Sequence, residues 1–135
     1  MGLTPSRLYL DSCIAIYLVE EHHDFAAPLE SLLESHSEAE VCISDLTILE
    51  CLVMPLRSGN QALKEKFDRW FKSVTILSLT GAVFVKAAQL RAKNASLKTP
   101  DSLHLAAAIH YDSDEFWTND TRLDNITPEI VRNVL

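Results

Sequence analysis

The chain has 135 residues, of which 47% are hydrophobic and 23% charged, and its formal net charge is −7 at pH 7. This composition is typical of a folded globular protein, so we expect one domain spanning residues 1–135 rather than a disordered chain. No apolar run reaches the roughly 18 residues of a membrane helix, and the three cysteines form no C-x-x-C pair, which indicates buried thiols and a cytoplasmic location.

The first predicted element is a short apolar strand at residues 7–10, which ends at Asp11. A helix that contains residues 14–18 follows it, and a second helix is predicted at 25–33 from its apolar face. A second buried strand is predicted at 41–43.

Ser44 is well placed to cap the next helix, whose apolar positions lie within residues 46–53. Pro55 is expected to perturb or end this helix, because proline lacks a backbone N–H. Aromatic and leucine side chains at spacings of three and four predict a further helix at 63–71, and a third strand is predicted at 74–79.

Thr80 is expected to cap a helix over residues 83–90. Thr99, followed by a proline, predicts the start of another helix with this threonine as its cap. A fourth strand is predicted at 116–118 and a short fifth strand at 130–134. Strands that alternate with helices in this way predict an α/β fold around a short parallel sheet of four or five strands.

Acidic residues follow two of the predicted strands. The first strand runs into Asp11, and the fourth runs through Asn119 into Asp120. Ligands of an open parallel sheet bind outside the carboxyl ends of its strands, so both acids are expected near a site. Glu50, in the second turn of its helix, and Asp101, in the first turn of another, are expected near the same edge.

Four carboxylates that converge without basic partners repel one another and take up protons. A hard divalent cation such as Mg²⁺ removes this repulsion, activates a water molecule, and neutralises the charge of a phosphate under attack. The sequence therefore predicts a metal-dependent hydrolytic site, and the bound cation answers the objection that an acidic chain is a poor ligand for an acidic polymer.

Each acid also has a purely structural alternative. Asp11 can cap the helix that follows it, and Asp101 can be a first-turn residue favoured by the helix dipole. Glu50 can be a solvated helix residue, and Asp120 can form a turn.

Four segments carry a resemblance to a known family. They are YLDS at 9–12, S-x-x-T-x-x-E at 44–50, LKTPDSLHLAAA at 97–108, which is the most specific, and WTND at 117–120. Together they resemble the PIN domain, in particular the VapC-type toxin ribonucleases of toxin–antitoxin systems. The resemblance implies a three-layer α/β/α fold, hydrolysis of RNA that leaves a 3′-hydroxyl, a homodimer, and a cognate antitoxin partner.

The resemblance also assigns roles to individual residues. It places Asp11, Glu50, Asp101 and Asp120 on the family's metal-site acids, which bind Mg²⁺ or Mn²⁺. It places Thr118 on a supporting polar position, with Asn119 and Ser12 as further supporting residues. Cys13 departs from the family, which often has asparagine or another polar residue there.

Basic residues and histidines are further candidates for contact with RNA or metal. Arg91, Lys93 and Lys98 precede Asp101 in the chain and are candidates for phosphate contact. The five histidines show no ligand spacing, and His104 is predicted to be an ordinary helix-face residue.

The sequence bears on three alternative functions. One is a non-catalytic PIN-like module that binds RNA or protein, but such a module is expected to lose site carboxylates. Another is a PIN nuclease that acts in RNA processing. A haloacid-dehalogenase-like phosphatase needs a second aspartate two positions after the first, and Cys13 occupies that position.

Overall fold

The computed structural model describes residues 5–135, and these residues contain a five-stranded parallel sheet. The strand order is β3-β2-β1-β4-β5, so the first strand lies at the centre and the connection from β3 to β4 passes over β2 and β1. The strands are β1 (Arg7–Leu10), β2 (Glu40–Ser44), β3 (Thr75–Leu77), β4 (Glu115–Thr118) and β5 (Val131–Asn133). The predicted parallel sheet is confirmed.

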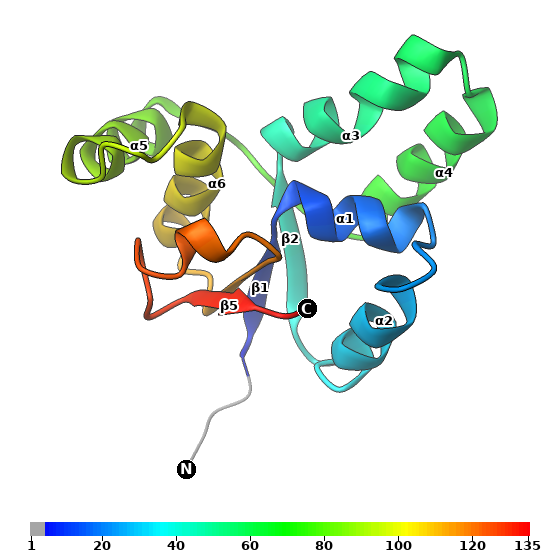
Figure 1. Ribbon diagram of the computed structural model, residues 1–135, viewed down its shortest axis with the longest axis horizontal. Helices are drawn as coiled ribbons and strands as arrows, with labels where there is room; N and C mark the ends of the chain where they lie inside the picture. Colours follow the sequence, from blue (N-terminus) through cyan, green and yellow to red (C-terminus); the bar gives the residue numbers. More distant parts are fainter. Residues whose placement is uncertain (1–4) are drawn as a thin grey trace.

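Helices cover both faces of this sheet. Figure 1 shows α5, α6 and a short 3₁₀ helix, η1, on one side, and α1 to α4 on the other. The bounds are α1 (Ser12–Val19), α2 (Ala26–Glu34), α3 (Asp45–Ser58), α4 (Gln61–Phe71), α5 (Gly81–Lys93), α6 (Thr99–His110) and η1 (Thr121–Leu123). The molecule therefore has the three-layer α/β/α architecture that the family resemblance implied.

The alternation of side chains along each strand builds two separate cores. In β1, Leu8 and Leu10 pack into the cluster formed with α1, α2 and α4, whereas Tyr9 packs into the cluster formed with α5 and α6. All three side chains are fully buried. Consecutive residues of a strand point to opposite faces, so a sheet covered on both sides needs a nearly continuous apolar strand.

Two helix ends differ from the prediction. Pro55 lies inside α3, which continues to Ser58 and ends where Gly59 adopts the left-handed conformation with φ of 68°. Lys98, not Thr99, is the N-cap of α6. The second difference arises because the first-turn N–H groups of a helix have no intrahelical partner, so a proline there does not fix which residue caps the helix.

Candidate active site

Asp11 is held in place by two hydrogen bonds at the end of β1. Its Oδ1 accepts a hydrogen bond from the backbone N–H of Ser12 at 2.8 Å, and its Oδ2 accepts one from the Thr118 hydroxyl at 2.8 Å. The residue is buried and is also the N-cap of α1. Each carboxylate oxygen can accept more than one hydrogen bond or ligand, so Asp11 keeps unused acceptor positions.

Asp120 is connected to Asp11 through the same threonine. The Thr118 hydroxyl oxygen accepts a hydrogen bond from the backbone N–H of Asp120 at 3.0 Å while the hydroxyl donates to Asp11. Thr118 is fully buried, because it ends β4 beside the centre of the sheet. One buried hydroxyl thus fixes the ends of β1 and β4 relative to each other.

Asp101 faces these two acids from the first turn of α6. Burial raises its pKa above the ordinary value, and the negative charges of Asp11 and Asp120 raise it further. Asp101 lines the same groove as Arg122, which pairs with Asp120, and Asp120 is linked to Asp11 through Thr118. The structure therefore brings together three aspartates that the sequence separates by 90 and 19 positions.

Glu50 lies beside this group and is held by a buried polar network. Its Oε1 accepts hydrogen bonds from the Ser12 hydroxyl at 2.6 Å and from His104 Nε2 at 2.5 Å. Burial acts to raise the pKa of Glu50, but the hydrogen bonds from His104 and Ser12 outweigh it and hold the pKa below its ordinary value. Glu50 is therefore an oriented, ionised carboxylate and not the solvated residue of the structural alternative.

His104 was not predicted to belong to the site, and the structure corrects this. It is buried, and its Nδ1 lies 2.7 Å from the hydroxyl of Tyr9, which donates a hydrogen bond to the Ser44 hydroxyl at 2.8 Å. Burial raises the pKa of Tyr9, so this phenol stays protonated. The spacing of three between Asp101 and His104 was the available sequence signal, because residues three apart share a helix face.

A basic residue also contacts the acids, contrary to the expectation that they lack basic partners. The Arg122 guanidinium forms a bidentate ion pair with the Asp120 carboxylate: Nε lies 2.9 Å from Oδ1 and Nη2 lies 2.6 Å from Oδ2. This pairing lowers the pKa of Asp120. Asp120 also accepts a hydrogen bond from the backbone N–H of Arg122 at 3.0 Å, so it forms the turn that the structural alternative described.

Two open grooves meet at these residues. The larger one, of about 400 Å³, is lined by Asp11, Cys13, Tyr17, Asn119, Asp120, Thr121 and Arg122. The other, of about 230 Å³, is lined by Ser96, Leu97, Asp101, Arg122, Leu123 and Ile126. Asp11, Asp101 and Asp120 thus line open grooves rather than a closed cavity, and Glu50 lines neither groove.

Two uncharged side chains, those of Asn119 and Cys13, also line the larger groove. The Asn119 amide lies 3.5 Å from the Tyr17 hydroxyl, so it faces the groove from the end of β4. Burial, followed by the charge of Asp11, raises the pKa of Cys13 to about 11, so this residue remains a neutral thiol.

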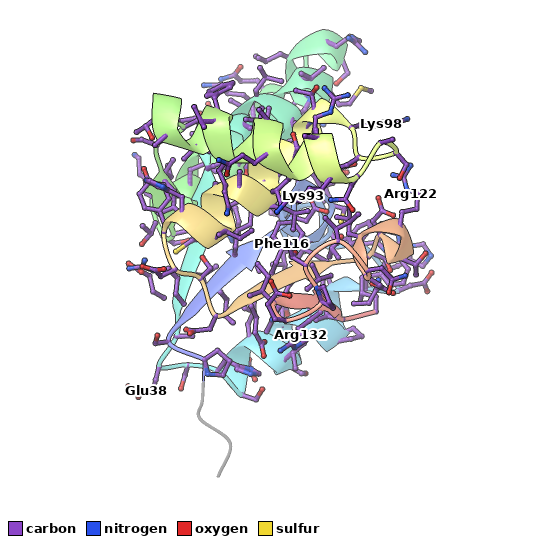
Figure 2. The ribbon with its side chains drawn as sticks, turned by 90° about the vertical axis from the view of Figure 1, so that its left-hand side faces the viewer. Glu38, Lys93, Lys98, Phe116, Arg122 and Arg132 are labelled. Carbon is purple, nitrogen blue, oxygen red and sulfur yellow. The ribbon has the colours of Figure 1, made fainter. Side chains whose placement is uncertain are left out.

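The three predicted phosphate contacts have different surroundings. Arg91 donates hydrogen bonds to the Leu97 carbonyl at 2.9 Å and to the Thr99 hydroxyl at 3.0 Å, and so it fixes the connection between α5 and α6. Lys93 and Lys98 are exposed. Figure 2 shows Lys98 projecting at the same edge of the molecule as Arg122.

The acids fit a hard divalent cation by their chemistry, since they offer oxygen ligands and an excess of negative charge at Asp101. They are not packed as tightly as a closed ligand set. Within residues 5–135, the group of three whose ligand atoms all lie within 4.8 Å of one another is His22, His23 and Asp24. The His22 and His23 rings are stacked with an interplanar angle of 11°, so their in-plane lone pairs do not converge on one ion.

Comparison with solved structures finds proteins of similar fold. The chain is 18% identical to a chain of VapBC2 from Rickettsia felis bound to a promoter DNA fragment, with a TM-score of 0.78 and coverage of 94% of this chain and 98% of that one. It is 20% identical to a chain of a toxin–antitoxin complex from Klebsiella pneumoniae, with a TM-score of 0.78 and coverage of 95% and 98%.

A third similar structure is VapC20 of Mycobacterium tuberculosis, described as a toxin that cleaves the sarcin–ricin loop. It is 14% identical, with a TM-score of 0.70 and coverage of 90% of this chain and 93% of that one.

No curated protein sequence matches the chain significantly. The family model of the PIN domain matches residues 8–127, which include all but the first residue of β1, the whole of β2 to β4, and all four predicted acids. The chain therefore belongs to the PIN domain family.

Proposed function

We propose that this protein is a metal-dependent endoribonuclease and the toxin component of a toxin–antitoxin pair, with residues 1–135 acting as a single nuclease domain. The observation that carries the proposal is the grouping of Asp11, Asp101 and Asp120 around two adjoining grooves at the carboxyl edge of a parallel sheet. Burial, and after it the charges of Asp11 and Asp120, raises the pKa of Asp101. Membership of the PIN domain family supports the same function.

The proposed site assigns a role to each residue around the acids. Asp11, Asp101 and Asp120, together with Glu50, would hold Mg²⁺ or Mn²⁺. When bound, the cation would supply positive charge to the scissile phosphate and make a water molecule more acidic.

The neighbouring residues position the acids for this task. Thr118 orients Asp11 through its hydroxyl, and Ser12 and His104 orient Glu50. Asn119 faces the groove in which the RNA would lie. Second-layer contacts of this kind set the direction and the basicity of metal-binding carboxylates.

The proposed partners are an RNA substrate, a cognate antitoxin and a second copy of the chain. The similar structures from Rickettsia felis and Klebsiella pneumoniae are toxin–antitoxin complexes, which supports an antitoxin partner. Apolar side chains that are 52–61% exposed support protein contacts of α3 and α5; they are Leu49, Met54, Leu56, Phe84 and Val85.

We also propose that the protein acts in the cytoplasm. All three cysteines are free thiols, which suits a reducing compartment. In the described part of the chain, every helix falls short of the length and apolar character needed to cross a membrane.

The direct test is RNA cleavage by Asp11→Asn and Asp101→Asn variants in buffer that contains Mg²⁺ or Mn²⁺. Both variants are expected to lose cleavage while they keep the circular dichroism spectrum of the wild type, and EDTA is expected to abolish wild-type cleavage until the metal is restored. Cleavage by either variant at the wild-type rate would refute the assignment. RNA binding by a wild type that never cleaves would indicate the non-catalytic alternative.

A further inference from the structure

Arg122 is an exposed arginine in direct contact with one of the proposed metal-binding acids, Asp120. Its guanidinium occupies both oxygens of Asp120, at 2.9 Å and 2.6 Å. Its positive charge also acts on Asp101, whose pKa it lowers against the larger effects of burial and of the other acids. Arg122 lines both grooves, so it lies between the one that contains Asp120 and the one that contains Asp101.

The ion pair between Arg122 and Asp120 is weak enough for another ligand of Asp120 to displace the guanidinium. The Arg122 side chain is 69% exposed and belongs to a 3₁₀ helix of three residues, whereas the Asp120 side chain is 23% exposed. Exposed ion pairs contribute at most about 1 kcal/mol, since water and salt compete for both groups. A divalent cation that binds Asp120 would compete for the same two oxygens and would repel the guanidinium.

In a nuclease, a guanidinium released from a carboxylate can bind a phosphate of the substrate instead. Its planar set of N–H donors matches the oxygens of a phosphate as well as those of a carboxylate. Figure 2 shows Arg122 at the molecular surface, at the same edge as Lys98. An RNA chain that reaches the acids along either groove would pass this side chain.

We propose that Arg122 exchanges between two anions: it holds the Asp120 carboxylate in the metal-free protein and binds a phosphate of the RNA once a divalent cation occupies that carboxylate. This inference rests on the proposed nuclease function and assigns Arg122 a role in substrate binding. It also supplies a basic contact to RNA beside the carboxylates of a chain whose net charge is −7.

The experiment compares Arg122→Gln and Arg122→Lys with Arg69→Gln, a control that removes the same charge from an exposed position on α4. Binding of Mn²⁺ alone is measured by isothermal titration calorimetry. Binding of a short single-stranded RNA is measured by fluorescence anisotropy in Ca²⁺ over a series of salt concentrations, with gels to show that the RNA stays intact.

Arg122→Gln is expected to bind Mn²⁺ about two- to fivefold more tightly, because the competing ion pair is gone. It is expected to bind RNA several-fold more weakly, and the slope of the logarithm of affinity against the logarithm of salt concentration should fall by about 0.7, the value for one lost contact to a single strand. Arg122→Lys keeps the charge and should largely restore this slope. Arg69→Gln should change neither affinity.

Opposite changes in the two affinities distinguish an exchange from a structural defect, which would weaken both. The inference is overturned if Arg122→Gln behaves like Arg69→Gln, or if its affinities for Mn²⁺ and RNA fall together. A wild type that binds neither Mn²⁺ nor RNA would overturn the proposed function as well, whereas an active wild type with an unaffected Arg122→Gln variant would overturn only the exchange.

Discussion

His104 Nε2 lies 2.5 Å from Oε1 of Glu50, and this contact joins α6 to α3 behind the acidic groove. A carboxylate only accepts hydrogen bonds, so Nε2 carries the proton in this pair. On the other side of the ring, Nδ1 faces the hydroxyl of Tyr9 at 2.7 Å. The imidazole therefore connects a site carboxylate to the buried centre of β1.

Replacing this histidine should destabilise the protein measurably. We expect His104→Ala to lower the free energy of unfolding by about 2–3 kcal/mol, because it removes one buried partner from Glu50 and one from Tyr9 and leaves each with a single remaining side-chain contact, to Ser12 and to Ser44 respectively. Urea denaturation followed by circular dichroism measures the change. The control is His110→Ala, an exposed position near the end of the same helix, which should stay within about 0.5 kcal/mol of the wild type. Equal stability of the two variants would contradict the role assigned to His104.

The fold and part of the site could be predicted from the sequence, because they depend on patterns among neighbouring residues in the chain. Asp11 directly follows β1 and Asp120 lies two residues after the end of β4, and strand ends are visible as the points where apolar runs stop. The contacts of His104 and Arg122 could not be predicted from such patterns. Whether a helix residue is buried depends on how the helix is rotated against the sheet, and the side-chain conformation of an exposed arginine is not encoded in its neighbours along the chain.

The Thr118 hydroxyl should matter to catalysis more than to folding. It donates to Asp11 and accepts from the backbone of Asp120, so Thr118→Val removes both contacts while it keeps the shape of the side chain. We expect about a 10- to 100-fold loss of metal affinity or of RNA cleavage, as found when residues behind metal ligands are replaced. Thr118→Ser keeps the hydroxyl and should recover most of the activity. A Thr118→Val variant as active as Thr118→Ser would exclude this role.

The exposed apolar side chains of α3 provide a test of the proposed homodimer. Leu49 is 60% exposed, and Leu49→Glu places a charge on this face. We expect the wild type to elute as a dimer in size-exclusion chromatography with light scattering, and Leu49→Glu to shift toward the monomer, because burial of an unpaired charge in an interface is costly. Ala62→Glu adds the same charge at an exposed position of α4 and should leave the dimer intact. A monomeric wild type would refute the homodimer.

The ionised Asp101 side chain should destabilise the metal-free protein, because it is partly buried and lies near two other carboxylates. Burial and the charges of Asp11 and Asp120 raise its pKa above the ordinary value of 3.8, so the folded state favours the protonated form. Below the unfolded-state pKa the side chain is protonated in both states and costs nothing. As the pH rises through the raised folded-state pKa, the ionised form becomes unfavourable in the folded state and stability is lost.

Asp101→Asn is therefore expected to raise the melting temperature of the metal-free protein at pH 7, by about 2–4 °C if the repulsion is worth about 1 kcal/mol. The difference from the wild type should shrink as the pH falls toward 4. Added Mg²⁺ should reverse the order, because binding to the folded state stabilises the wild type more than a variant that has lost a ligand. Glu38→Gln makes the same change from carboxylate to amide at an exposed position and should show no such pH dependence. Thermal unfolding in EDTA and in Mg²⁺ at several pH values measures both effects, and an Asp101→Asn variant less stable than the wild type in EDTA at pH 7 would show that the three aspartates do not repel one another in the absence of metal.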